Sequence, residues 1–166
     1  HAADGGNRSD KFIRDKKLLL EGIKEEPTNG RYYFYLAQTC YDLGEYEESI
    51  KYYKKRVEMP GFPEEDYYAR YKIGLAKYRA GHDFFEVLGQ LLGAWDYRKS
   101  RLEAIHDLVK YCQDRGDYKL GYQIGSLALE TPYPSKDYLF IDSGIHKWRF
   151  KFEVAKCGIE CCKAAE

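Results

Sequence analysis

Glycine interrupts the helical pattern of this sequence at a nearly regular interval, in YDLGEYEES, KYRAGHDFF and CQDRGDYKL. Around the interruptions apolar residues recur at helical spacing, as Leu36, Cys40 and Leu43 do before the first one. A residue just past a helix end often takes a positive φ, which carries no steric penalty for glycine. We therefore expect three helix–turn–helix units whose first helices end at Gly44, Gly81 and Gly116.

The residues around these glycines set the expected element boundaries. An acidic or polar residue follows each glycine and is expected to help start the next helix: Glu45, His82 and Asp117. Upstream, a lone helix is predicted to end at Pro27. A segment rich in proline and glycine, ETPYPSKDYLFIDSG, predicts a structured loop before a final helix. We expect about eight helices: a lone helix over 11–26, repeats over 31–60, 64–99 and 101–132, a loop over 132–144 and a closing helix over 145–163.

Composition excludes several classes of function. The net charge is zero, so nothing indicates a nucleic-acid partner. No apolar run approaches the roughly 18 residues of a membrane span, and no signal peptide is evident. The 5 cysteines follow no framework spacing and predict reduced thiols in a cytoplasmic protein. The chain begins with His1 and not with Met, so we expect a piece of a longer protein.

The spacing and the residue types resemble tetratricopeptide repeats, which are helix–turn–helix units of about 34 residues. The first unit matches through Tyr33, Leu36, Ala37, Gly44, Tyr46, Ser49, Tyr53 and Pro60. The second matches through Ile73, Gly74, Gly81, Leu91 and Ala94, and the third through Ile105, Leu108, Gly116, Tyr118, Gly121, Ala128 and Pro132. The resemblance implies an all-α, right-handed superhelical solenoid of antiparallel helix pairs. Two departures, Arg56 for a small residue and Gly125 for an aromatic one, are expected to weaken single packing contacts.

Three segments resemble more specifically the tetratricopeptide-like tail of bacterial and viral family 2 glycosyltransferases. They are HAADGGNRSDKFIRDKKLLLEG, GRYYFYLAQTCYDLGEYEESIKYYKKRVEM and ETPYPSKDYLFIDSGIHKWRFKFE. The resemblance implies that residues 1–10 are a linker from an upstream catalytic domain. In related enzymes a late histidine can complete the metal site, but we do not expect this role for His1, which could not act without the missing domain. The nucleotide-binding fold, acidic metal motif and catalytic base of such enzymes lie outside this sequence. The ending KCGIECCKAAE departs from the pattern, where another helix pair would follow.

For each polar cluster we favour a structural explanation over a functional one. Cys157, Cys161 and Cys162 form the sharpest cluster, but a metal site needs four suitable ligands, so we expect packed thiols and no metal. The adjacent acidic pairs diverge on a helix and predict a solvated face or helix starts rather than acid–base catalysis. The basic, tyrosine-rich run KYYKKR has core spacing, so we do not expect single-stranded nucleic acid to bind it. The sequence therefore predicts no catalytic residue and no cofactor.

The sequence also predicts a ligand groove along the first helices of the repeats. Its expected residues are Phe34, Tyr35, Gln38, Tyr71, Lys72, Arg79, His106 and Lys110. By resemblance, Tyr35 and Gln38 replace two asparagines of the family's clamp for a peptide carboxylate. An aromatic, mixed-charge groove suits an extended peptide or sugar rings instead. In the alternative interpretation the loop PYPSKDYLFID partly fills the groove.

Two functions follow. The first is a non-catalytic accessory module of a family 2 glycosyltransferase, which positions a glycan acceptor, a protein partner or a subunit for an upstream catalytic domain. The second is a free-standing adaptor that binds a peptide or protein. An apolar face on the closing helix further predicts self-association.

Overall fold

The computed structural model describes residues 5–163, and every regular element in that range is a helix. The predicted all-α fold class is confirmed. The right-handed superhelical arrangement of the helix pairs stays a prediction. None of the helices within residues 5–163 combines the length and the apolar character that crossing a membrane requires. Residues 1–4, including His1, lie outside the described range.

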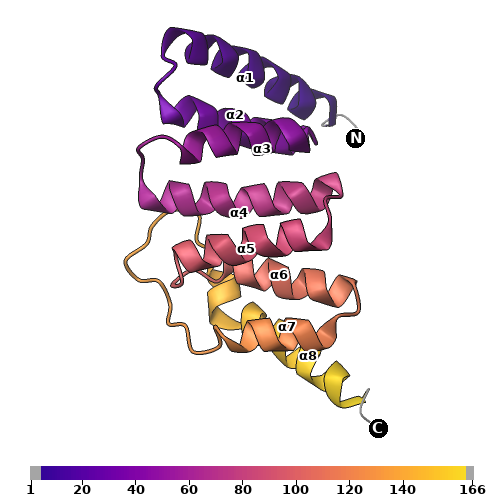
Figure 1. The fold of residues 1–166 in the computed structure, drawn as a ribbon. Coiled ribbons are helices and arrows are strands. Elements are labelled where there is room, and N and C mark those ends of the chain that lie inside the picture. Colours follow the sequence, from indigo (N-terminus) through magenta and orange to yellow (C-terminus); the bar gives the residue numbers. More distant parts are fainter. Residues whose placement is uncertain (1–4, 164–166) are drawn as a thin grey trace. The chain divides into compact units, whose positions relative to one another are not determined.

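The chain divides into two compact units, unit 1 over His1–Val87 and unit 2 over Leu88–Glu166. Figure 1 labels their helices. The helices of unit 1 are α1 (Gly5–Glu25), α2 (Gly30–Asp42), α3 (Tyr46–Val57) and α4 (Pro63–Ala80). Helix α5 (Phe84–Tyr97) contains the boundary. Unit 2 continues with α6 (Glu103–Asp114), α7 (Tyr118–Ser126), the π-helical turn η1 (Ile145–Arg149) and α8 (Phe150–Lys163).

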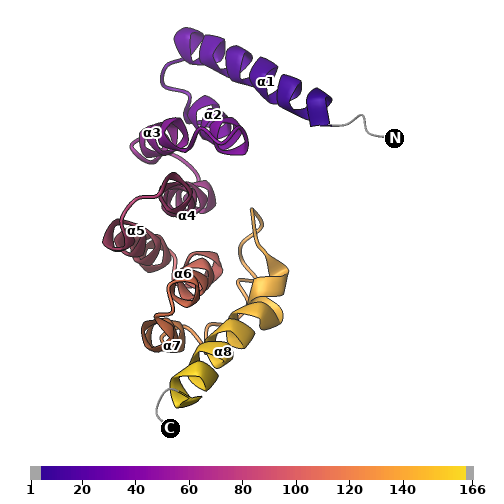
Figure 2. The same cartoon turned by 90° about the vertical axis from the view of Figure 1, so that its right-hand side faces the viewer.

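In unit 1 each helix packs against the next along the chain, α1 on α2, α2 on α3 and α3 on α4. Figure 2 looks nearly along the axes of α2, α3 and α4. The shared core joins large side chains to small ones: Phe34, Ala37, Ile50, Tyr53, Ala69, Ile73 and Ala76. The Ser49 hydroxyl donates to the Ala37 carbonyl oxygen at 2.8 Å. This hydrogen bond satisfies a small polar residue that is buried between α2 and α3.

The three repeat glycines take the predicted conformation. Gly44, Gly81 and Gly116 have φ between 78° and 80°. In each case the glycine N–H and the next N–H bond back into the last turn of the helix, as Gly44 to Tyr41 and Glu45 to Cys40 do. This is the Schellman ending. The predicted helix starts are met only in part. Glu45 and Asp117 are the N-cap residues of α3 and α7 but make no side-chain capping bond. At α5 the cap is Asp83 rather than His82, and it accepts from two backbone N–H groups.

Arg56, expected to weaken packing, is instead a buried structural residue. It is 1% exposed, and its guanidinium donates to Asp66 Oδ1 at 2.8 Å and Glu65 Oε2 at 3.1 Å. A Cβ built on Gly61 would lie 1.9 Å from the guanidinium. The acidic first turn of α4, expected to be a solvated face or a helix start, therefore also ties α4 to α3.

In unit 2, α6 packs on α7, and α8 contacts both. Two glycines of α7 allow the close approach. A Cβ on Gly121 would lie 2.9 Å from Cys157 Sγ, and one on Gly125 would lie 2.4 Å from Val154 Cγ2. Gly125, which departs from the repeat pattern, therefore makes room for α8.

Some element boundaries differ from the expected ones. Helix α1 begins at Gly5, so residues 5–10 of the expected linker are helical. The expected closing helix begins as the π-helical turn η1 and becomes α-helical at Phe150. The loop before it begins earlier than expected, because α7 ends at Ser126. Each difference arises at a helix end, where apolar periodicity constrains the chain least.

Candidate functional site

Aromatic and cationic side chains of α2 and α4 meet on one face of unit 1. Phe34 and Tyr68 have ring centroids 6.0 Å apart, and the Lys72 ammonium lies 3.4 Å from the centre of the Tyr41 ring. Around these two contacts, Tyr35 packs edge-on against Phe34 at 5.6 Å. We name Tyr35, Gln38, Tyr41, Tyr68 and Lys72 the α2/α4 face.

The helical repeat explains this arrangement. Phe34 and Tyr41 lie two turns apart on α2, and Tyr68 and Lys72 lie one turn apart on α4, so each pair shares a side of its helix. Phe34 is 1% exposed and supports the ring of Tyr35, which is 43% exposed. The Arg31 guanidinium reaches the Tyr35 hydroxyl at 3.4 Å. The face therefore presents a supported tyrosine to solvent with Arg31 beside it, while Lys72 lies against Tyr41.

The eight predicted groove residues divide into three sets. Tyr35, Gln38, Lys72 and Arg79 are partly or fully accessible in unit 1. Phe34 and Tyr71 were expected to face a ligand, but they are 1% and 9% exposed and belong to the core. Phe34 packs against Tyr53 of α3, and Tyr71 packs against Tyr67 and Tyr68 of its own helix. Periodicity alone cannot separate such buried positions from groove positions.

The two predicted residues of α6 belong to unit 2. His106 is 4% exposed, and its Nδ1 lies 2.8 Å from Asp107 Oδ1, so it does not face open solvent as expected. Lys110 is exposed. Sequence reasoning missed Tyr41 and Tyr68, although both belong to the unusual tyrosine content of this chain.

The chemistry of the α2/α4 face suits an extended or ring-shaped polar ligand. An accessible tyrosine offers a flat apolar surface and a hydroxyl. Lys72 is held over Tyr41 by a cation–π contact, a geometry worth roughly 0.5–2 kcal/mol, so its position is restrained before a ligand arrives. Gln38 offers both a donor and an acceptor. The face therefore combines stacking with hydrogen bonding and positive charge.

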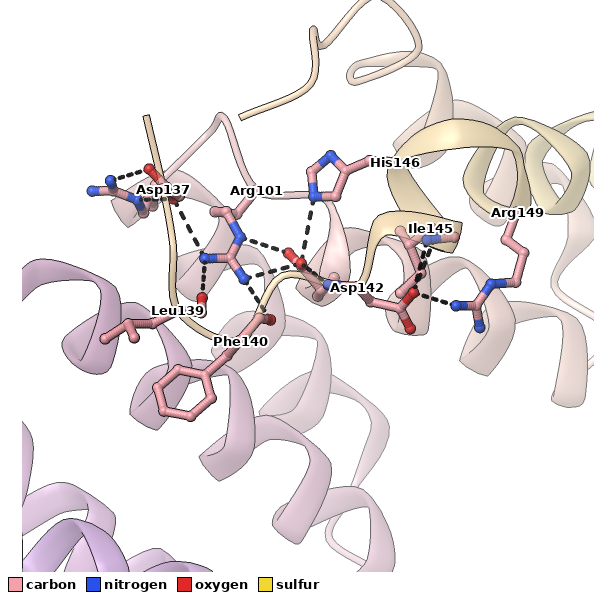
Figure 3. A network of polar contacts seen from close by, with 11 residues as sticks. Arg101, Asp137, Leu139, Phe140, Asp142, Ile145, His146 and Arg149 are labelled. Carbon is pink, nitrogen blue, oxygen red and sulfur yellow. Dashed lines mark hydrogen bonds and ion pairs between the residues drawn. The ribbon is translucent and has the colours of Figure 1, made fainter. Parts of the chain in front are cut away.

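A second ordered polar site lies in unit 2, where the loop between α7 and η1 crosses the start of α6 (Figure 3). Arg101 is completely buried, and its guanidinium donates to both Glu103 carboxylate oxygens at 3.0 Å. It also donates to the backbone oxygens of Leu139 at 3.0 Å and Phe140 at 2.7 Å. Phe140 has a φ of 58°, rare for a residue with a side chain, and this turn directs its carbonyl oxygen to Arg101.

A further ion pair also holds this loop. Arg98 donates to Asp137 through Nε at 2.7 Å and through a terminal nitrogen at 2.5 Å. We name Arg98, Arg101, Glu103 and Asp137 the loop latch. Arg98 holds the pKa of Asp137 below its ordinary value, against the opposing effect of burial. The latch therefore fastens the loop to residues 98–103.

Glu103 joins the latch to η1. Its Oε1 accepts from the Asp142 backbone N–H at 3.1 Å and lies 3.4 Å from His146 Nε2. Burial acts to raise the pKa of Glu103, but contacts with His146 and Arg101 outweigh it and lower the pKa to about 2. A buried carboxylate that stays ionised holds three segments of unit 2 together.

The latched loop borders an open hollow of about 310 Å³. Its walls are Arg98, Ser100, Tyr133, Pro134, Ser135, Lys136 and Asp137. That volume is at the small end of the range for ligand sites. Since both carboxylate oxygens of Asp137 already accept from arginines, the latch leaves this carboxylate little capacity for a ligand.

The cysteine cluster follows the expected packing only in part. Burial raises the pKa of Cys112 to about 11 and also raises that of Cys157, which keeps both as unreactive thiols. Cys161 is half-buried and Cys162 is exposed. Within residues 5–163, His, Cys, Asp and Glu side chains form no group of three or more that could hold a metal ion.

No model of a known protein family matches this chain, and a search of curated proteins finds no similar sequence. The functional argument therefore depends on the residues of the α2/α4 face and on the repeat pattern.

Proposed function

We propose that this chain is a cytoplasmic, non-catalytic interaction module of tetratricopeptide type, which binds an extended ligand on the α2/α4 face. The observation that carries the proposal is the pairing of α2 and α4 through Phe34–Tyr68 and Lys72–Tyr41. These are the first helices of two consecutive repeats, and such helices line the ligand surface of repeat arrays. Tyr35 and Lys72 are the residues that contact the ligand.

The resemblance to family 2 glycosyltransferase tails extends this proposal. In that setting the module positions a glycan acceptor, a protein partner or a subunit for a catalytic domain elsewhere in the protein. A supported tyrosine with neighbouring polar groups suits sugar rings as well as peptides. The alternative is a free-standing adaptor, for which the same face binds only peptides or proteins.

Calorimetric titration with two ligand panels tests the proposal. One panel contains oligosaccharides and the other contains extended peptides that combine aromatic and acidic residues. Tyr35→Ser should weaken binding about tenfold, because one aromatic anchor contributes on the order of 1–2 kcal/mol. Tyr97→Ser is the matched control, since Tyr97 is also 43% exposed but lies outside the face.

The results separate the two settings. Binding of oligosaccharides that is sensitive to Tyr35→Ser supports acceptor positioning. Binding of peptides alone, with the same sensitivity, supports the adaptor. Equal loss in both variants, or binding insensitive to Tyr35, would contradict the assignment of the face.

A further inference from the structure

The outer face of α8 is unusually apolar for a helix face that is open to solvent among the described residues. Large exposed apolar patches often mark interaction surfaces. The inner face of α8 is buried through Phe150, Val154 and Cys157. On the outer face of η1 and α8, however, Trp148, Phe152 and Ile159 are 58%, 57% and 57% exposed. Three large apolar side chains therefore face solvent on one short segment.

These side chains form one continuous strip. Trp148 and Phe152 have ring centroids 6.2 Å apart, at an interplanar angle of 66°, so they lie together across the junction of η1 and α8. Beyond Phe152, the positions i+3, i+7 and i+10 on the same side of the helix are Ala155, Ile159 and Cys162. The strip therefore runs the length of α8.

The two halves of the strip have opposite shapes. Its N-terminal half projects two aromatic rings. Its C-terminal half borders a hollow of about 580 Å³ between α7 and α8, lined mostly by small or apolar residues: Tyr122, Ala155, Gly158, Ile159, Cys161, Cys162 and Lys163. A surface with projections at one end and a hollow at the other can complement a reversed copy of itself.

The charges beside the strip can likewise complement a reversed copy of themselves. Arg149, Glu153, Lys156 and Glu160 follow one another along one flank at helical spacing, so positive and negative charges alternate in the sequence. Within one copy Arg149 already pairs with Asp142 and Glu160 with Lys163, and one carboxylate oxygen of Glu153 is buried, so pairing between copies adds to or exchanges these contacts. Read backwards, this order places an acid opposite each base. Antiparallel pairing of two copies therefore sets Arg149 against Glu160 and Glu153 against Lys156, whereas parallel pairing in register would oppose like charges.

We propose that the α8 strip is the interface of a two-fold symmetric homodimer, in which two α8 helices cross antiparallel near Ala155. The rings of Trp148 and Phe152 of each copy enter the hollow of the other. A two-fold interface requires a self-complementary patch, and both shape and charge supply one here. The dimer does not depend on the α2/α4 face.

The expected affinity is modest. Each exposed aromatic ring can bury on the order of 100 Å² more, which places the interface near the low end of stable complexes. We expect a dissociation constant around the micromolar range, and therefore a dimer whose population depends on concentration.

Cysteine cross-linking tests the symmetry directly. Cys161 and Cys162 are first replaced by serine, so that no accessible native thiol on α8 competes. In this background Ala155→Cys should form a disulfide-linked dimer under mild oxidation, because the two-fold axis brings the two Cβ atoms together. Lys147→Cys is the matched control, since antiparallel helices place these two positions roughly 25 Å apart.

Analytical ultracentrifugation provides the second measurement. The wild-type chain should change from monomer to dimer across the micromolar range, and Phe152→Asp should remain a monomer with an unchanged circular dichroism spectrum. Lys151→Asp, an exposed position outside the alternating flank, should dimerise like the wild type. Monomer at all concentrations, cross-linking of both cysteine variants, or assembly beyond dimers would each overturn the proposal. The last result would indicate a head-to-tail contact with the exposed Ile13 and Leu18 of α1.

Discussion

Replacing Arg101 by methionine should destabilise unit 2 more than any surface change in this chain. All the guanidinium nitrogens of Arg101 donate hydrogen bonds, to Glu103, to Asp137 and to two loop carbonyl oxygens. Methionine replaces the unbranched stem of arginine, but it lacks the guanidinium and offers none of these donors. Glu103, 3% exposed, would be left as a buried carboxylate without its arginine.

The magnitude follows from the burial. Removing one partner of a buried ion pair costs about 3–5 kcal/mol, a large part of the roughly 5–15 kcal/mol stability of a typical domain. With a urea dependence of about 2 kcal/mol per molar, the unfolding midpoint should fall by about 2 M. Trp95 and Trp148 both lie in unit 2, so tryptophan fluorescence reports the relevant transition.

Two companion variants separate charge from packing. Arg101→Lys keeps the charge but cannot form the same fork of hydrogen bonds, so it should recover only part of the loss. Arg101→Met with Glu103→Gln removes the stranded charge while an amide oxygen still accepts from Asp142, so it should be more stable than Arg101→Met alone. A midpoint change below about 0.5 M for Arg101→Met, or a double variant no better than the single one, would refute this account of the latch.

Four further outcomes are expected. The low pKa of Glu103 gives stability that is full above its ordinary value of 4.5 and is lost as pH falls toward 2, so acid unfolding followed by fluorescence should be less steep in Arg101→Met. Hydrogen bonds to Glu86 and Glu47 raise the pKa of His82 above 6.5. The stabilisation from these bonds is therefore full below pH 6.5 and is lost as the pH rises through the raised pKa. Melting curves from pH 6 to 9 should show this loss of stability, and Glu47→Gln should make the loss smaller. Gly125→Ala should lower the free energy of unfolding by about 1–3 kcal/mol, because the added methyl overlaps Val154. Gly81→Ala should lower it by about 1–2 kcal/mol through the positive φ of that position alone. Urea unfolding measures both changes. Arg56→Met should lower the midpoint of unit 1, followed by circular dichroism, because Glu65 and Asp66 lose their buried partner; an unchanged midpoint would mean that these ion pairs do not stabilise the fold.

The repeat pattern predicts the helices and their endings well, for a local reason. The positive φ of Gly44, Gly81 and Gly116 follows from one residue type at one position, and the structure confirms it. Apolar periodicity fixes which side of a helix is buried only when one side packs. Phe34 and Tyr71 pack on more than one neighbour, and their burial therefore could not be separated from exposure on a groove.

The polar architecture could not be predicted from the sequence, because its partners lie far apart along the chain. Arg101 meets Leu139 and Phe140 only after the loop folds back across α6. Arg56 resembles a poor fit to its repeat position until Gly61 and the acidic start of α4 are placed beside it. Buried arginines of this kind depend on three-dimensional neighbours, which no local pattern encodes.

The most direct test of the proposed binding face is a chemical-shift titration of the labelled protein with the extended-peptide and oligosaccharide panels. The account predicts saturable shifts at Tyr35, Gln38 and Lys72, with the latch residues of unit 2 unchanged. Saturable binding whose shifts lie elsewhere, or no shift with either panel, would contradict the claim that the α2/α4 face is the ligand site.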